Sequence, residues 1–208
     1  MRAKRWAILS LIMLTTAVFT GCSDDDSNPA EPVQTGIMDT TDKLMDGFIE
    51  SFTTLDAEGY CDLLDDRYVF YYLGGEDHDY DTEARIIGNM FSGNPPANPA
   101  PNSINSGIRA IEISRFETVE PWADVSSSHP DFADVTDAQY GLFRVRLTCI
   151  VDDGTITIDG QQIFFAAPAD VLVDGEAKTV WRLLGQQDVR NKAGSDQTHW
   201  SDLKALFR

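Results

Sequence analysis

The residues whose types and spacing could do chemistry are few, and the densest group is a run of acids at Asp77, Asp79, Asp81 and Glu83. Alternating carboxylates begin the calcium loop of an EF-hand. Counted from Asp77, however, Thr82 stands where the loop requires glycine, and Gly88 stands where it requires its final glutamate. Helical spacing also starts inside the supposed loop, with Asp81 placed as the helix cap and Glu83 in the first turn. We predict a polar loop and a helix cap, with weak calcium binding as the alternative.

A second candidate group is a pair of aspartates followed by tyrosines in the segment LLDDRYVFYY. An isomerase or lyase that works without a cofactor needs a carboxylate base in an apolar pocket and a donor to the developing oxyanion. Asp65 or Asp66 could be the base, and Tyr71 could be the donor. The alternative is a purely structural role, in which the segment is a helix end followed by a buried aromatic strand, and we favour this interpretation. We therefore expect no catalytic set, with these residues as the candidates if there is one.

The remaining chemically useful residue types lack the spacings that their chemistry needs. His78, His129 and His199 lie in polar segments, and none belongs to an HxxxH or HExxH pattern. The sequence contains no GxSxG elbow and no glycine-rich phosphate loop. We therefore expect surface histidines, no metal site and no cofactor.

The first 22 residues carry the clearest signal for location. Three basic residues precede an apolar stretch, residues 6–19, that is too short to span a bilayer and is typical of a signal peptide. The stretch ends in VFTGC, which resembles a bacterial lipobox. That resemblance implies cleavage of residues 1–21 and acylation of Cys22. The alternative is an ordinary secretory signal with a chance cysteine.

Lipidation would make the mature chain a membrane-tethered protein of the bacterial cell envelope. Several acyl chains on one cysteine hold a protein firmly, because each buried methylene adds about 0.8 kcal/mol. The residue after Cys22 is Ser23 rather than aspartate, which indicates the outer membrane, facing the periplasm. Residues 22–37 are polar, acidic and proline-containing, and they predict a flexible tether. Residues 38–208 are enough for a single domain.

The net charge of the mature chain limits the classes of partner that it can bind. Residues 1–21 hold three of the 16 basic residues and none of the 34 acidic ones, so the mature chain has 13 basic residues and a net charge of −21. Such a surface repels phosphate backbones and anionic lipid headgroups. We expect no nucleic acid among the partners. Cationic ligands, metal ions and basic proteins stay possible.

Two cysteines follow Cys22, at Cys61 and Cys149. An exported protein can oxidise such a pair. Two buried free thiols fit the sequence equally well, because sequence does not establish the geometry that a disulfide requires. Both alternatives stay open.

The apolar patterns predict helices first and long strands afterwards. Helical spacing covers residues 41–55, Asp56 caps a second short helix, and residues 82–91 form a third. An aromatic strand at residues 66–73 separates the second helix from the third. Further strands are predicted at residues 108–122, 140–151, 155–167 (with a bulge at Asp159–Gly160) and 179–189. HWSDLKALFR is a short terminal helix, or a segment packed over a sheet edge. The order predicts an α+β domain with a helical hairpin and a third helix on a curved antiparallel sheet.

That order, together with the segment FIESFTTLDAEGYCDLLDDRYVFYYL, resembles the nuclear transport factor 2-like superfamily, which includes SnoaL-like and ketosteroid-isomerase-like proteins with a cystatin-like cone fold. The resemblance covers roughly residues 39–189. The whole chain also resembles bacterial lipoproteins of no known activity that carry this domain. The resemblance implies a pocket between the concave sheet and the helices. Relatives use it for isomerisation, dehydration or cyclisation, while others only bind ligands or dimerise through the open sheet face.

Several strand residues are candidates to line this pocket. One of Gln186 and Gln187 must face inward, and a buried glutamine needs hydrogen-bond partners. The candidates for ligand binding are Tyr71, Phe164, Trp181 and Gln187. Arg144, Arg146 and Arg182 are basic residues on strands, which either pair with acids across the sheet or meet a partner subunit or an anionic ligand.

These observations predict a lipid-anchored envelope protein whose cone domain binds a small apolar ligand or a protein partner. The alternative is a cofactor-free lyase or isomerase that uses a pocket carboxylate. A third possibility is a structural module that forms a homodimer through the outer sheet face.

Overall fold

The computed structural model describes residues 37–96, 106–127, 129–152, 154–173, 175–189 and 199–208. The predicted signal peptide, Cys22 and all of the tether except Ile37 lie outside these ranges. Lipidation therefore stays a prediction. Within the described ranges, no helix is both long and apolar enough to cross a membrane.

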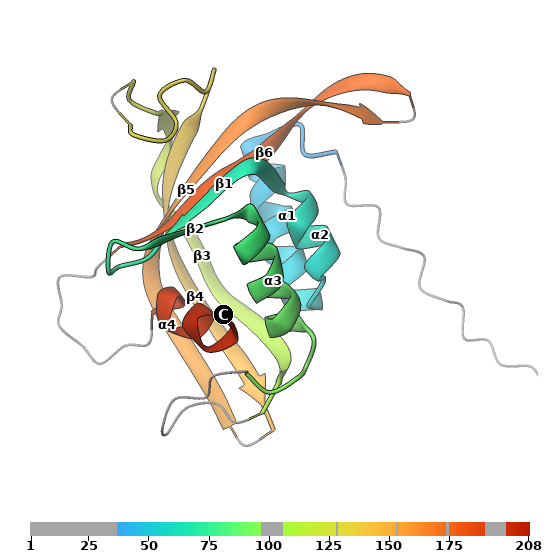
Figure 1. The fold of residues 1–208 in the computed structure, drawn as a ribbon, viewed down its shortest axis with the longest axis vertical. Helices are drawn as coiled ribbons and strands as arrows, with labels where there is room; N and C mark the ends of the chain where they lie inside the picture. Colours follow the sequence, from blue (N-terminus) through green and yellow to red (C-terminus); the bar gives the residue numbers. More distant parts are fainter. Residues whose placement is uncertain (1–36, 97–105, 128, 153, 174, 190–198) are drawn as a thin grey trace, which may run out of the picture. The chain divides into compact units, whose positions relative to one another are not determined.

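The domain begins with the predicted helical hairpin, α1 (Thr41–Thr54) and α2 (Ala57–Asp62), shown in Figure 1. Thr40 caps α1 by accepting from the Lys43 amide at 3.2 Å, and Asp56 caps α2 by accepting from the Gly59 amide at 2.9 Å. Leu55 lies between them with φ of 56°, a left-handed conformation that ends α1. Both predicted helices and the Asp56 cap are confirmed.

The third helix, α3 (Tyr80–Phe91), begins earlier than predicted. The residue that caps it is Asp79, whose side chain accepts from the Thr82 amide at 3.1 Å, so the expectation that Asp81 is the cap is wrong. The physical reason is that β2 (Asp77–Asp79) pairs with the preceding strand and is already extended up to the helix start.

Six strands form one curved sheet in the order β2-β1-β6-β5-β4-β3. The strands besides β2 are β1 (Leu64–Tyr71), β3 (Ile108–Asp124), β4 (Gln139–Val151), β5 (Gly154–Val173) and β6 (Glu176–Val189). The predicted α+β fold is confirmed. One detail differs, because the sheet is mixed rather than purely antiparallel: β1 runs parallel to β6. A parallel pair needs a long connection, and β2, α3, β3, β4 and β5 lie between β1 and β6 along the chain.

The expected bulge at Asp159–Gly160 is wrong. Both residues pair in continuous register with β4, and the shift in β5 lies between Phe165 and Ala166, against β6. From Ala167 of β5 and Arg182 of β6 outward, the two strands pair only with each other and form a two-stranded arm, drawn in orange in Figure 1. The base of this arm forms one wall of a cleft on the outside of the domain.

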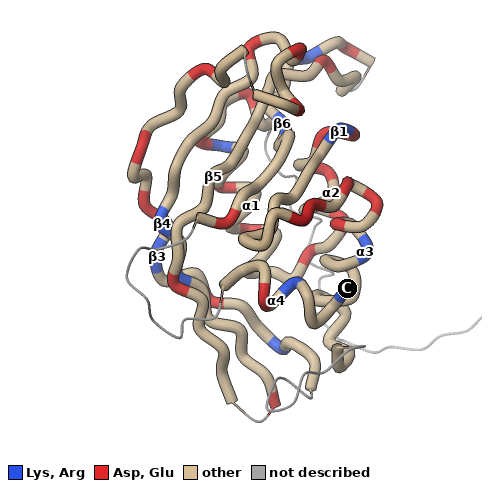
Figure 2. The backbone as a smooth tube through the Cα atoms, turned by 60° about the vertical axis from the view of Figure 1, so that its left-hand side comes forward, with Lys and Arg blue, Asp and Glu red and all other residues tan. Residues whose placement is uncertain are grey.

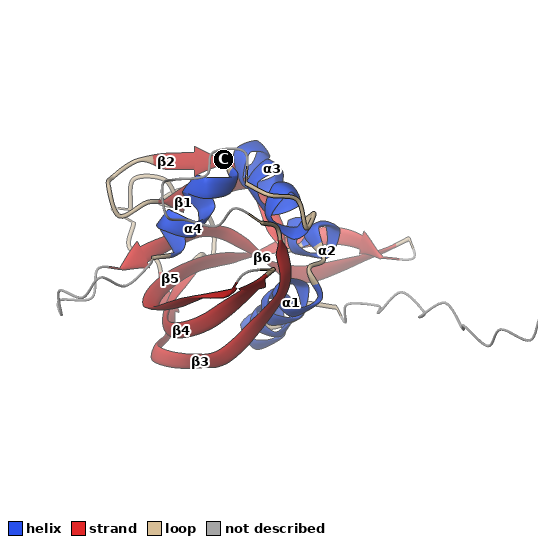
Figure 3. Ribbon diagram, turned by 90° about the horizontal axis from the view of Figure 1, so that it is seen from below, coloured by secondary structure: helices blue, strands red, loops and turns tan. Residues whose placement is uncertain are grey.

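Helices and strands share one main core on the inner side of the sheet (Figures 1 and 3). Phe48 and Phe52 of α1 meet Phe164 of β5 and Trp200 of the last helix, α4 (Trp200–Phe207). A smaller cluster lies on the opposite sheet face, where the polar segment between β3 and β4 inserts the buried Phe132. The sequence predicts α4 as a terminal helix or an edge cover, and it forms a helix that packs into the core.

Candidate functional site

The densest polar cluster in the described domain surrounds Glu83 of α3, whose side chain is fully buried. Its Oε1 accepts from the Tyr60 hydroxyl at 2.7 Å and from Lys204 Nζ at 2.6 Å. Its Oε2 accepts from His78 Nε2 at 2.6 Å. These partners come from α2, α4 and β2, so one carboxylate joins four elements that are far apart in the sequence.

Lys204 of α4 is also fully buried, and its ammonium lies between a charge and a ring. Nζ is 3.6 Å from the centre of the Phe70 ring in β1 and 5.7 Å from the Trp200 ring. The His78 ring stacks on Phe70, with ring centres 5.2 Å apart and planes tilted by 15°. An ammonium ion over an aromatic face gains electrostatic attraction, and more so when it is removed from water.

The surroundings set the protonation of this cluster. Burial alone would raise the pKa of Glu83, but the charge of Lys204 and the hydrogen bond from His78 outweigh it and lower the pKa to about 2. Burial lowers the pKa of Lys204, against the opposing charge of Glu83. Burial and the charge of Glu83 raise the pKa of Tyr60, so its hydroxyl stays protonated and donates. Glu83 is thus held as an ionised hydrogen-bond acceptor, and its pKa lies far below the near-neutral value that suits a general base.

The hydrogen bonds continue from Tyr60 into the sheet. The hydroxyls of Tyr60 and Tyr68 lie 3.4 Å apart, and the Tyr68 hydroxyl is 3.4 Å from Gln186 Oε1. Gln186 Nε2 donates to Gln162 on β5. Because every member is buried, the chain of hydrogen bonds satisfies groups that would otherwise be costly to remove from water.

Asp188 connects this chain back to α4. It accepts from Gln162 Nε2 at 2.7 Å, and from both the amide (2.7 Å) and the hydroxyl of Ser201. Burial raises the pKa of Asp188, although the hydrogen bonds from Ser201 and the charge of Lys204 oppose the shift. Helix α4 is therefore fixed by buried acids at two places, Glu83 through Lys204 and Asp188 through Ser201.

The ligand-binding candidates from the sequence do not meet in one site. Tyr71 lies on the outer sheet face and donates to Asp131, whereas Phe164 is fully buried in the inner core. Trp181 lies on the arm, where its amide donates to the Met38 carbonyl at 2.6 Å. Gln187 is half-buried, and the inward glutamine is Gln186, which is 1% exposed.

The candidate carboxylates lie outside the cone. Burial alone would raise the pKa of Asp65, but its hydrogen bonds with Arg67, at 2.7 and 3.0 Å, lower it. The side chain of Asp66 is 96% exposed. Neither aspartate contacts the cluster around Glu83, and both border a cleft on the outside of the domain.

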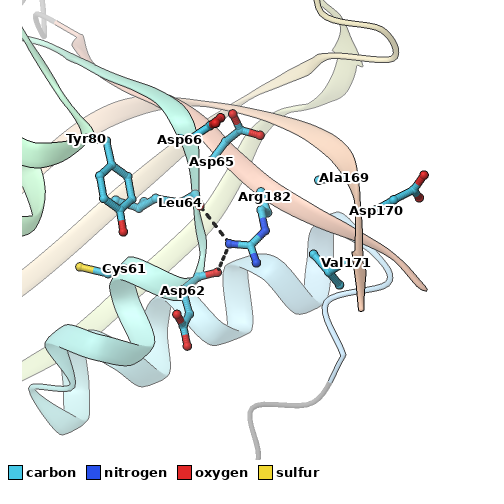
Figure 4. A pocket seen from close by; sticks show the side chains of 10 residues that line it. All are labelled: Cys61, Asp62, Leu64, Asp65, Asp66, Tyr80, Ala169, Asp170, Val171 and Arg182. Atoms are coloured by element: carbon cyan, nitrogen blue, oxygen red, sulfur yellow. Dashed lines mark hydrogen bonds between the residues drawn. The ribbon is translucent and has the colours of Figure 1, made fainter. Parts of the chain in front are cut away.

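This outer cleft has a volume of about 370 Å³ and lies between α2, β1, α3 and the base of the β5–β6 arm (Figure 4). Its lining residues are Cys61, Asp62, Leu64, Asp65, Asp66, Tyr80, Ala169, Asp170, Val171 and Arg182. Arg182 extends across the cleft and donates to the carbonyls of Asp62 at 2.7 Å and Leu64 at 3.0 Å, while Asp170 points away from it. An adjoining pocket of about 240 Å³ shares Asp62, Val171 and Arg182 and is otherwise mostly apolar.

The structure places the histidines and cysteines of the described residues in different environments, and one histidine departs from the predicted surface position. His78 is buried, although it was expected on the surface, while His129 stacks on Phe132 with ring centres 4.8 Å apart. Cys61 is half-buried and Cys149 is buried, and both are free thiols. Burial raises the pKa of Cys149 to about 12, which makes this thiol unreactive at neutral pH.

Sequence reasoning missed the Glu83–Lys204 pair, yet a signal for it exists. Glu83 precedes Ile86 and Ile87 by three and four positions, so it shares their apolar helix face. Lys204 likewise follows Trp200 by four positions and precedes Phe207 by three. A lone acid and a lone base on two apolar helix faces are a pattern that predicts a buried ion pair.

No protein-family model and no curated protein matches this chain. Solved structures with a similar fold include an "NTF2-like protein of unknown function in nutrient uptake" from Rhodospirillum rubrum, with 12% identity, 72% of this chain and 97% of that chain covered, and a TM-score of 0.46. An NTF2-like superfamily protein from Salmonella enterica has 13% identity, coverages of 76% and 93%, and a TM-score of 0.46. A Caulobacter vibrioides protein described as uncharacterised with a cystatin-like fold has 9% identity, coverages of 73% and 87%, and a TM-score of 0.40. At these identities the likeness concerns the fold alone.

Proposed function

We propose that this chain is a binding protein of the bacterial envelope, held at the outer membrane through a lipid on Cys22, and that it binds a basic protein partner at the outer cleft. The observation that carries the proposal is the cleft itself. It is open, it lies between four separate elements, and aspartates at Asp62, Asp65, Asp66 and Asp170 border it.

Binding is assigned to the cleft rather than to the cone because the concave side of the sheet is already occupied. Trp200, Leu203 and Phe207 of α4 are each at most 2% exposed and fill that side. A small apolar ligand in the cone would have to compete with these side chains. The cleft requires no such rearrangement.

Charge and shape favour a basic protein as the occupant. Acidic residues lie along α2 and at the start of β1 (Figure 2), and the predicted mature chain carries a net charge of −21. Fields of one sign steer partners of the opposite sign and raise association rates. The adjoining apolar pocket, which Met38 and Trp181 help to line, offers the kind of dry site in which an anchoring side chain contributes most.

The catalytic alternative gains no specific support from the geometry. A pocket base requires a raised pKa, whereas Arg67 lowers that of Asp65. Asp66 is exposed to water. We therefore propose binding without catalysis.

The membrane tether has a direct test. Replacing Cys22 by serine (Cys22→Ser) should move nearly all of the protein from the membrane fraction to the soluble envelope fraction, because a serine in the lipobox accepts no lipid. Cys61→Ser is the matched control and should stay with the membrane. Membrane retention of the Cys22→Ser variant, at the level of the control, would contradict the tether.

The cleft is tested by photo-crosslinking in cells that make the full chain. A photoreactive residue in place of the exposed Asp62, which lines the cleft, should give a discrete product with a second protein, and one in place of the exposed Asp124 on β3 should not. Adding Asp66→Lys should reduce the yield of the crosslinked product several-fold, because the new lysine repels the basic partner, while Asp124→Lys should not reduce it. Equal products from both positions, or a product of two copies of this chain, would contradict the proposed partner.

A further inference from the structure

The groups that surround the Lys204 ammonium belong almost entirely to the rest of the domain and not to α4. Glu83 Oε1 lies 2.6 Å from Nζ, and the Phe70 ring centre lies 3.6 Å from it. Tyr60 and His78 fix the carboxylate by donating to Oε1 and Oε2. These four residues come from α3, β1, α2 and β2. The domain thus builds a receptor for a cation, and α4 brings the cation to it.

We propose that the cone contains a binding site for primary alkylammonium ions, which Lys204 fills from within the same chain. The site combines an ionised, desolvated carboxylate with an aromatic face, and this is the chemistry that recognises an ammonium group. It is separate from the outer cleft, so the inference does not depend on the proposed function.

The geometry selects a primary ammonium over other organic cations. Guanidinium groups bind carboxylates best through two parallel hydrogen bonds, but Oε2 of Glu83 is already taken by His78. A quaternary ammonium carries no N–H to donate to Oε1. A primary ammonium needs only one hydrogen bond to the carboxylate, which Oε1 accepts beside the Tyr60 hydroxyl, and it presents its remaining surface to Phe70.

The fit of α4 leaves polar atoms without partners around this site. His78 Nδ1 and Trp200 Nε1 are buried, and neither has a hydrogen-bond partner among the described residues. Buried donors and acceptors without partners weaken the packing that holds them. The natural occupant is therefore held less tightly than the close Glu83–Lys204 contact alone implies, and an added alkylammonium ion can bind to the carboxylate once the Lys204 side chain has been removed.

The test uses the full chain with Lys204→Ala, which removes three methylenes and the ammonium and retains Cβ. The space that remains matches n-propylammonium. At about ten times its Kd, this ion should raise the Tm of the variant by roughly 3–6 °C. Methylammonium should bind more weakly because it makes fewer contacts, and n-butylammonium should bind more weakly because it is too long for the space.

Three controls separate recognition of charge from simple cavity filling. Neutral n-propanol should give a much smaller shift in Lys204→Ala. Lys204→Met, which keeps the space filled, and the wild-type chain should not respond to n-propylammonium. Adding Glu83→Gln to Lys204→Ala should abolish the response. If Lys204→Ala does not fold alone, the same series is applied to its refolding yield, which n-propylammonium should restore and n-propanol should not.

A synthetic peptide with the sequence of residues 199–208 distinguishes the source of the ammonium, because it binds only if it displaces α4 of the Lys204→Ala chain and brings its own lysine to Glu83. Stabilisation of Lys204→Ala by both this peptide and n-propylammonium indicates a lysine of a partner segment as ligand, whereas a response to n-propylammonium alone indicates a small amine. Equal shifts with n-propanol and n-propylammonium, or no shift with either, would overturn the proposal.

Discussion

Replacing Glu83 by glutamine lowers the free energy of unfolding by about 3–5 kcal/mol, because it leaves the Lys204 ammonium buried without its counter-charge. Glu83 and Lys204 are both fully buried, so water cannot take over from the lost partner. Lys204→Met should cost less. In that variant Tyr60 and His78 still donate to Glu83, and methionine fills most of the lysine volume.

The double variant Glu83→Gln/Lys204→Met decides whether the loss arises from an unpaired charge. With both charges removed, desolvation no longer penalises the folded state, and the double variant should be more stable than Glu83→Gln alone. Urea unfolding at pH 7 measures all four chains, and Asp124→Asn is a control at an exposed position. A loss below about 1 kcal/mol for Glu83→Gln, or additive losses in the double variant, would show that the pair is not the coupled unit described above.

Local rules predicted the helices and strands well because caps and apolar spacing are properties of neighbouring residues. Asp56 was identifiable as an N-cap from residue type and position. The start of α3 was misplaced by two residues because β2 depends on pairing with β1, which is not visible in the local sequence. The parallel contact of β1 with β6 joins segments more than a hundred residues apart and has no local signature either.

The site was harder to predict than the fold, and Glu83 shows why. In isolation, an acid in the first turn of a helix is explained by the helix dipole and by water. Its actual environment depends on Lys204, which lies 121 residues later on a helix predicted only as a terminal segment or edge cover. The polar cluster thus arises from tertiary packing of α4 into the cone, and its local signal is limited to one acid and one base on apolar helix faces.

The same pair predicts a component of acid sensitivity. In the folded chain the pKa of Glu83 is about 2, below its ordinary value of 4.5, because Lys204 and His78 outweigh the effect of burial. A depressed carboxyl pKa contributes stability that is fully present above pH 4.5 and is lost as the pH falls towards 2. The difference corresponds to about 3 kcal/mol. The unfolding free energy of wild type, measured between pH 7 and pH 2.5, should therefore fall more steeply with decreasing pH than that of Glu83→Gln/Lys204→Met.

Asp188 provides the opposing control, because burial raises its pKa. A raised carboxyl pKa contributes stability that is present below its ordinary value of 3.8 and is lost as the pH rises through the folded-state pKa. Asp188→Asn removes this opposing component and should make the acid loss of the chain steeper. Parallel pH profiles for wild type and the double variant would show that Glu83 is not held ionised by Lys204, and the ammonium site inferred in the cone would then lack its anion.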